Sequence, residues 1–446
     1  MTLLPLSTVQ QATVEWICAG GASAFGLNVS LSLRLRGPLC RSALERALGY
    51  VLGRHEGLRS RVQRADGTFL QFFADSAEVY DLTPVRLDDI EAAEARIAER
   101  LAARLDLERK GPLCAELLQL SERDHVLLLV ISHTATDTHA DELLLSELLS
   151  AYASYARGSS PSLPAAMSFT EYLASETQAG TRLNEMQLKY WGEVIQGATP
   201  AIPRRAGPAT AHAPARGRIL SRSTSAATTR ALEDFAANSK VSLMAVLSAV
   251  MLLAVSKEFG LEDVCAFTTH AGRDSSRLRT LGASTGRDFL IRMVLPNGGS
   301  LAQLAKSVQT KLIRAAISSR LPFTHERALA QLPPEPPLAT AERAHLFITD
   351  ALRITNGVDN PVPELAIERV MPGPLLQDGF AFEAGWPASD AAYVGVLNVL
   401  LRRDLSPEPG HPISFVAVFI DDTIEEAVVR AFLSRVCAIA ERVTEF

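Results

Sequence analysis

The residues best suited to chemistry in this sequence form one short cluster. His133, Asp137 and His139 lie within seven residues of one another. A neutral imidazole accepts a proton near neutral pH, so His133 is a candidate general base. The alternative interpretation is a loop histidine with a purely structural role.

The spacing within this cluster does not predict a metal site. Separations of four and six residues in a turning loop match neither the i, i+4 histidine pair of a zinc-binding helix nor another zinc-ligand pattern. The five cysteines are also scattered, odd in number and outside any C-x-x-C pair. We therefore expect reduced, mostly buried thiols, with no disulfide framework and no bound metal.

The cluster is predicted to lie between a buried strand and a helix. Residues 126–131 are all apolar, which indicates a central strand covered on both faces. Apolar residues then recur on one helical face from about Ala140 to Arg157. Asp137 can cap this helix, and free N–H groups at the helix N-terminus would stabilise an oxyanion formed beside His133.

Strand and helix patterns alternate through the rest of the chain. Apolar residues with a period of two predict a strand over Leu27–Arg36, and Asp66-Gly67 predicts a hairpin turn. The other predicted elements are helices after Ser42 and over Ile90–Leu107, Thr228–Ser239, Ser242–Phe259 and Ile424–Val443, and strands over Val264–Thr269 and Ile413–Ile420. Such alternation in both halves predicts an α/β (α+β) protein of two lobes.

We expect the lobes to be residues 1–175, which carry the His133 loop, and residues 176–446. Within the second lobe, the Pro/Ala/Arg-rich stretch 199–222 has no usable period and is predicted to cross between the lobes. The arginines of this stretch either meet an anionic partner or are solvated linker residues.

Composition excludes several classes of protein. The 446 residues are 47% hydrophobic and 21% charged, which is typical of a globular chain rather than a disordered or fibrous one. The net charge of −6 argues against nucleic acid as the main partner. The N-terminus does not resemble a signal peptide, and no uncharged run reaches the ~18 residues of a membrane span. We expect a cytoplasmic protein with no membrane partner.

Six segments of the chain together resemble the motifs of one known family. Residues 132–138, Ser-His-Thr-Ala-Thr-Asp-Thr, look like a variant of an H-H-x-x-x-D-G motif. The further segments are Ser7-Thr8-Val9-Gln10-Gln11, Arg54-His55-Glu56-Gly57-Leu58-Arg59, Tyr190-Trp191 with Gly197, Ala271-Gly272-Arg273 and Leu321-Pro322-Phe323. In this order they resemble the condensation domains of non-ribosomal peptide synthetases, which belong to the chloramphenicol-acetyltransferase-like acyltransferase superfamily.

This resemblance implies a V-shaped pair of lobes with an active-site tunnel at their interface. A carrier protein would present an acyl or peptidyl thioester there on its phosphopantetheine arm, and a small-molecule amine or alcohol would attack it. His133 would be the catalytic residue, Asp137 would pair with Arg273, and no cofactor would be bound. His139, on the first helical turn, is a candidate tunnel-lining residue.

The motif is altered at two positions, where Ser132 replaces the first histidine and Thr138 replaces the glycine. Ser132 alone is compatible with a working active site, because the resemblance implies a supporting rather than a chemical role for the first histidine. A β-branched Thr138 would narrow the channel and disfavour positive φ. Three functions therefore stay open: a free-standing acyltransferase that makes an amide or ester, a catalytically silent domain that recruits a carrier or enzyme, and a coenzyme A-dependent acyltransferase.

Overall fold

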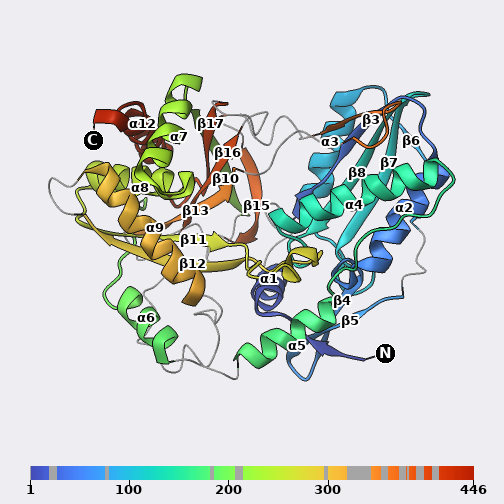
Figure 1. Ribbon diagram of the computed structural model, residues 1–446, viewed down its shortest axis with the longest axis horizontal. Helices are drawn as coiled ribbons and strands as arrows, with labels where there is room; N and C mark the ends of the chain where they lie inside the picture. The colour runs from blue at the N-terminus through green and yellow to red at the C-terminus, as the bar shows by residue number, and fades with distance from the viewer. Residues whose placement is uncertain are drawn as a thin grey trace. The chain divides into compact units, whose positions relative to one another are not determined.

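The computed structural model divides the chain into two compact units (Figure 1). The structure describes residues 2–19, 28–75, 80–180, 185–205, 214–295, 300–318, 343–352, 360–370, 378, 381–387, 396–403 and 411–445. Unit 1 consists of Met1–Gln178, Ala271–Gly286 and Asn356–Leu375, and unit 2 consists of Ala179–His270, Arg287–Thr355 and Leu376–Phe446.

Unit 1 contains a six-stranded and a three-stranded sheet. The larger sheet has the order β14-β3-β8-β7-β6, with β2 also paired to β8, and the smaller has the order β1-β5-β4. Its strands are β1 Leu4–Pro5, β2 Asn28–Ser30, β3 Leu33–Arg36, β4 Ser60–Ala65, β5 Thr68–Phe73, β6 Val85–Arg86, β7 Leu113–Ser121, β8 Asp124–Ser132 and β14 Ala366–Arg369. The central strand β8 is buried from His125 to Ser132, as its apolar run predicts.

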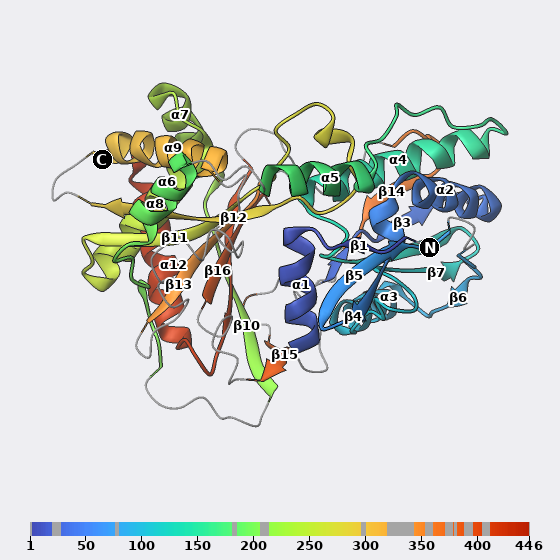
Figure 2. The same cartoon turned by 90° about the horizontal axis from the view of Figure 1, so that it is seen from below.

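The helices of unit 1 cover both faces of the larger sheet. They are α1 Thr8–Ala19, α2 Arg41–Arg54, α3 Ile90–Ala102, α4 Thr138–Ala156 and α5 Phe169–Gly180, with short 3-10 helices at Glu56–Arg59 and Leu278–Thr280. Helices α2 and α4 lie side by side on one face and α3 lies on the other (Figure 2). Apolar residues of α2, α4, β3 and β8 share one core.

Unit 2 is built on an eight-stranded mixed sheet of order β12-β11-β13-β16-β17-β10-β15, with β9 paired to β13. Its strands are β9 Ile202–Pro203, β10 Pro214–Ser223, β11 Asp263–His270, β12 Arg287–Val294, β13 Arg343–Ala351, β15 Ala381–Pro387, β16 Val396–Arg403 and β17 Ile413–Ile420. Its helices are α6 Glu185–Ile195, α7 Ala226–Ser239, α8 Leu243–Phe259, α9 Leu301–Ser318 and α12 Glu426–Glu441, with a 3-10 turn at Val443–Glu445. Helices α7, α8, α9 and α12 lie together on one side of this sheet (Figure 1).

The structure differs from the expected division into residues 1–175 and 176–446. Two segments of the expected second lobe, Ala271–Gly286 and Asn356–Leu375, fold with unit 1. The second supplies β14, which pairs with β3. The first is an excursion between β11 and β12, which are antiparallel neighbours in the sheet of unit 2. Such returns depend on long-range contacts that a local pattern does not contain.

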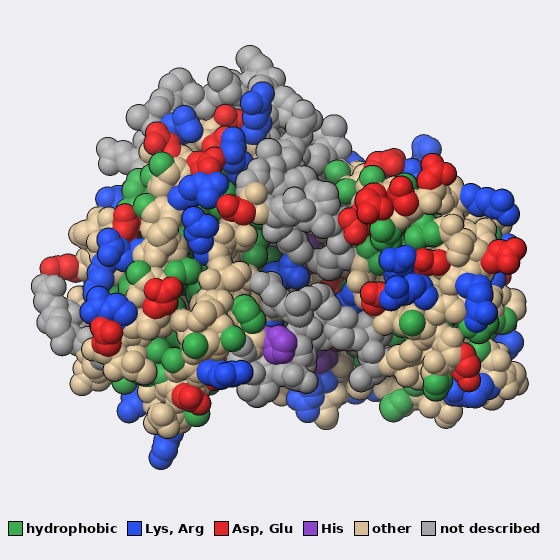
Figure 3. Space-filling model, turned by 90° about the horizontal axis from the view of Figure 1, so that it is seen from above, with side chains coloured by type: hydrophobic (Ala, Val, Ile, Leu, Met, Phe, Trp, Pro, Cys, Tyr) green, Lys and Arg blue, Asp and Glu red, His purple; other side chains and the backbone are tan. Residues whose placement is uncertain are grey.

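The prediction of a crossing segment over residues 199–222 is also wrong in part. Strand β10 begins at Pro214 and pairs with both β15 and β17. Ile219 and Leu220 are buried, while Arg218 forms ion pairs with Asp421 and Glu426. Acidic and basic side chains are interspersed on the face that Figure 3 shows. The arginine-rich composition reflects a strand with carboxylates beside it.

Smaller differences have local causes. The strand predicted over Leu27–Arg36 is divided into β2 and β3, because the Ser32 hydroxyl accepts a hydrogen bond from the N–H of Leu129 and interrupts the strand pairing. The hairpin at Asp66-Gly67 is confirmed, with both residues at positive φ. The structure describes the side chains of four of the five cysteines. These four are free, with Cys40 exposed and Cys265 alone among them fully buried. None of the described helices alone is long and apolar enough to span a membrane.

Candidate functional site

The loop between β8 and α4 begins with a tight turn. The N–H of Ala135 donates to the carbonyl of Ser132 over 2.9 Å. The Ser132 hydroxyl accepts from the N–H and the hydroxyl of Thr134, at 3.3 and 3.1 Å. Ser132 and Thr134 are both buried. Ser132 therefore stabilises the turn.

His133 is half-buried and its two ring nitrogens differ in their contacts. Nδ1 lies 3.3 Å from the carbonyl oxygen of Thr136. A carbonyl can only accept, so Nδ1 carries the proton and Nε2 keeps its lone pair. Within the described residues, Nε2 makes no hydrogen bond. Burial lowers the pKa of His133, and this effect outweighs the opposing effects of the Thr136 bond and the Asp137 charge. The ring is therefore neutral near pH 7.

Asp137 joins three parts of unit 1. It is the N-cap of α4, because its Oδ1 accepts from the N–H of Ala140 over 2.9 Å. Both carboxylate oxygens also accept from Nη2 of Arg273, at 2.9 and 3.0 Å. Oδ2 also accepts a hydrogen bond from the N–H of Thr285, over 2.8 Å. The capping role and the Arg273 pair, expected separately, are both present.

The Asp137–Arg273 pair lies within unit 1, which corrects our expectation of a pair across the lobes. The two residues are 136 positions apart, but the loop Ala271–Gly286 belongs to the same unit as Asp137. The Arg273 guanidinium also donates to the carbonyls of Leu278, Leu281 and Ala283 over 2.6 to 2.8 Å. One side chain thus fixes both the fold of its own loop and the contact of that loop with α4.

Gly272 is required where the loop starts. Its φ is +67°, and a Cβ built there would lie 2.3 Å from the carbonyl oxygen of Thr285. The Thr285 hydroxyl in turn donates to the carbonyl of Ala271 over 2.7 Å. A residue with a side chain would be both strained and obstructed at this position.

Thr138 and His139 form the first turn of α4. Within the described residues, only Asp66 and Lys240 among non-glycines have positive φ, so Thr138 has an ordinary negative φ and needs no glycine. Nε2 of His139 lies 3.1 Å from the carbonyl oxygen of Arg279, which joins the helix to the loop Ala271–Gly286. The proposed tunnel-lining role of His139 stays a prediction, as does the tunnel itself.

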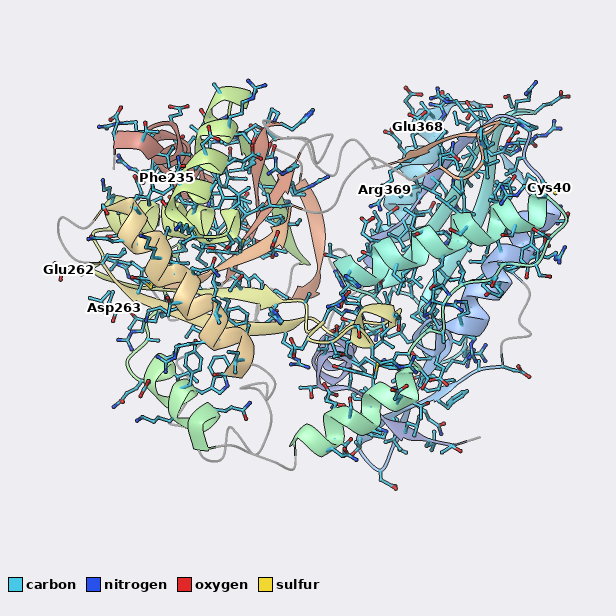
Figure 4. All side chains as sticks on the ribbon, in the orientation of Figure 1. Cys40, Phe235, Glu262, Asp263, Glu368 and Arg369 are labelled. Carbon is cyan, nitrogen blue, oxygen red and sulfur yellow. The ribbon has the colours of Figure 1, made fainter. Side chains whose placement is uncertain are left out.

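Sequence reasoning missed two residues beside the loop, Asp141 and Arg369. Asp141, on the first turn of α4, is 6% exposed and accepts a hydrogen bond from the Thr136 hydroxyl. Arg369, labelled in Figure 4, ends β14. Its side chain is 6% exposed and pairs with Glu142 over 2.8 Å. The signal for Asp141 was an acidic residue on the inner face of an amphipathic helix. Arg369 gave none, since β14 is placed by long-range pairing.

A model of the condensation domain family matches residues 3–332. The chain belongs to the condensation-domain family. Condensation domains bind no cofactor of their own, and their substrates arrive on the phosphopantetheine of carrier proteins. Among the described residues, no group of three or more His, Cys, Asp and Glu could hold a metal ion.

Two curated relatives illustrate the similarity of this condensation domain to peptide synthetases. A probable non-canonical synthetase, CymA, of Salinispora arenicola is 35% identical over 202 residues, which is 43% of this chain and 2% of that protein. An isonitrile lipopeptide synthase of Mycobacterium tuberculosis is 27% identical over 314 residues, 66% of this chain and 12% of that protein. This chain therefore spans a small part of the length of these relatives.

Solved structures confirm the mixed α/β fold. The X-domain from teicoplanin biosynthesis has a TM-score of 0.78 at 23% identity, over 99% of this chain and 95% of that one. The SgcC5 protein of Streptomyces globisporus has a TM-score of 0.77 at 20% identity, over 98% and 99%. A first condensation domain of the CDA synthetase gives 0.71 at 16% identity, over 99% and 97%. At these identities the likeness establishes the fold.

The R-H-E-x-L-R segment of this condensation domain is structural. Arg54 and His55 both bond to Glu147 of α4 at 2.8 Å, and Glu56 accepts from the N–H and hydroxyl of Thr170. These contacts attach the end of α2 to α4 and α5. The matching segment Leu321-Pro322-Phe323 lies outside the described residues.

Proposed function

We propose that this condensation domain transfers an acyl or peptidyl group from the phosphopantetheine thioester of a carrier protein to a small amine or alcohol, forming an amide or ester in natural-product biosynthesis. The observation that supports this most directly is the state of His133. Its Nδ1 proton is engaged by the Thr136 carbonyl, so a neutral Nε2 is available as a proton acceptor. A cytoplasmic location is part of the same proposal.

In the proposed reaction, the acceptor nitrogen or oxygen attacks the thioester carbonyl carbon while Nε2 of His133 takes its proton. The tetrahedral intermediate carries an oxyanion. Its collapse breaks the carbon–sulfur bond, and the His133 imidazolium returns the proton to the departing thiolate of the pantetheine arm. Each proton and electron pair is accounted for without a cofactor.

The N-terminus of α4 is the group we propose to face the oxyanion. The N–H of Ala140 is already used by the Asp137 cap. The contribution would therefore come from the N–H groups of Thr138 and His139 and from the helix dipole. The negative charge of Asp137 is balanced by Arg273, so the cap does not cancel this effect.

Intact-mass spectrometry of an acyl-loaded carrier protein tests the proposal. Wild-type protein with pooled amines and alcohols should unload the carrier and release a new amide or ester. His133→Ala should lower the rate roughly 10²- to 10⁴-fold, the range for a positioned proton acceptor. His139→Ala is the comparison, since it removes an imidazole from the adjoining first turn of α4 while His133 stays in place, and it should lower the rate far less than His133→Ala. Equal turnover by wild type and His133→Ala would refute the role of His133.

A second candidate function is a silent domain that recruits a partner enzyme. Two observations favour it: Ser132 and Thr138 replace motif residues, and the teicoplanin X-domain, of the same fold, forms a complex with OxyB. A silent domain would leave loaded carriers and acyl-coenzyme A unchanged and would still bind its partner. If only acyl-coenzyme A were consumed, the chain would instead be a coenzyme A-dependent acyltransferase.

A further inference from the structure

Asp141 is a buried carboxyl group that the proposed reaction does not use. It lies on the first turn of α4, four residues after the Asp137 cap, and is 6% exposed. Its Oδ1 accepts a hydrogen bond from the hydroxyl of Thr136, a side chain that is itself fully buried. Burial of a carboxyl group lowers the stability of the fold unless the group is hydrogen-bonded or paired with an opposite charge.

Thr136 connects Asp141 to His133. The carbonyl oxygen of Thr136 accepts from Nδ1 of His133, and its hydroxyl is bonded to Asp141. Two polar groups of one loop residue are therefore engaged, the backbone carbonyl by the imidazole and the side-chain hydroxyl by the carboxyl. A movement of the Thr136 backbone away from Asp141 would therefore also move the carbonyl relative to the ring.

Charged groups surround Asp141 from two elements. On the side of α4 these are Asp137 and Glu142, and from β14 the Arg369 guanidinium approaches. Burial raises the pKa of Asp141 to about 7, with Asp137 and Glu142 acting in the same direction, while the Thr136 hydrogen bond and Arg369 oppose the shift. Asp141 therefore changes its charge near physiological pH, on the helix turn that follows the loop of His133.

We infer that Asp141 is a positioning residue: it holds Thr136 so that the Thr136 carbonyl keeps the proton of His133 on Nδ1 and leaves Nε2 free to accept. The inference rests on the proposed function for its catalytic meaning. The hydrogen-bonded arrangement itself exists in the free protein. Protonation of Asp141 then changes the hydrogen bonding of Thr136 and is sensed by the imidazole.

The test is long-range ¹H–¹⁵N NMR of the histidine rings in the full chain, labelled with ¹⁵N-histidine and titrated from pH 5 to 9. Nine histidines are present, and His133→Gln identifies the signals of His133. Wild-type His133 should be mostly the Nδ1–H tautomer. Its shifts should show two inflections, one below 6.5 from the ring itself and one near 7 from Asp141.

Four variants separate the possible causes. Thr136→Val removes only the hydroxyl and should lower the ratio of Nδ1–H to Nε2–H tautomer about fivefold, the equivalent of one ordinary hydrogen bond. Thr136→Ser keeps the hydroxyl and should keep the ratio. Asp141→Asn keeps an acceptor oxygen and should abolish the inflection near pH 7. Glu142→Gln, which removes the neighbouring carboxylate of the same helix turn, should retain it.

An unchanged tautomer ratio in Thr136→Val, or an inflection near pH 7 that persists in Asp141→Asn, would overturn the inference. These measurements need no substrate. If they succeed while loaded carriers are never consumed, the proposed function fails and the positioning network stands. If carriers are consumed while the tautomer is insensitive to Thr136, the function stands and the inference fails.

Discussion

Replacement of Asp137 by Ala should destabilise unit 1 severely. The Arg273 side chain is 5% exposed and the Asp137 side chain 15%, so the variant leaves a buried guanidinium without its counter-charge. Breaking a buried pair in this way costs about 3–5 kcal/mol. The helix cap to Ala140 adds roughly 1 kcal/mol. For a unit of about 200 residues, each kcal/mol lowers Tm by roughly 2–4 °C, so we expect a loss of roughly 8–24 °C.

The assay is thermal unfolding of the full chain followed by near-UV circular dichroism. Glu171→Gln is a matched control, because Glu171 pairs with Arg277 of the same loop but both side chains are about half exposed. Solvent screens an exposed pair, which adds little to stability, so the control should unfold close to the temperature of wild type. If Asp137→Ala were no less stable than Glu171→Gln, the loop would not depend on the buried pair. Asp137→Ala should also lose any condensation activity, because the loop and α4 would separate.

Four further predictions concern single residues. Gly272→Ala should destabilise the protein by several kcal/mol, and by more than Gly158→Ala does. Both glycines have positive φ, but only at Gly272 would an added Cβ lie 2.3 Å from a backbone oxygen. Urea unfolding of the two variants measures the difference in their free energies of unfolding. If His133 is the base, kcat/KM should rise as pH increases through the pKa of His133, which burial places below 6.5, and a pH–rate profile with its inflection above 7 would contradict this. Burial raises the pKa of Asp141 from 3.8 to about 7, so between these pH values the folded state binds more protons than the unfolded state and the free energy of unfolding falls as pH rises. Asp141→Asn should remove that fall and be more stable than wild type at pH 8. Unfolding of both proteins at pH 5 and pH 8 measures this difference. Thr138→Gly should lower helix stability by up to about 1 kcal/mol, since Thr138 already has a helical φ. A large gain in condensation activity on a loaded carrier would instead indicate that the wild-type domain is catalytically silent.

The sequence determined the local elements of the site. An unbroken apolar run can only be a covered strand or a buried helix, and its length together with the polar residues that follow it identified β8, the loop and α4. Helix caps are equally local, because the side chain bonds a backbone N–H three residues away, as at Asp137 and Ser242. The family motif added the Asp137–Arg273 pair across 136 residues, which no periodicity contains.

Only the tertiary structure decided which unit holds each segment and how the site groups are charged. The loop Ala271–Gly286 leaves the sheet of unit 2 and is held in unit 1 by Arg273, and β14 reaches β3 from more than 300 residues away. The proton-binding properties of His133 and Asp141 likewise follow from burial, the Thr136 bonds and the approach of Arg369. Desolvation and long-range ion pairs depend on the complete packing around a group, and a local sequence pattern does not specify that packing.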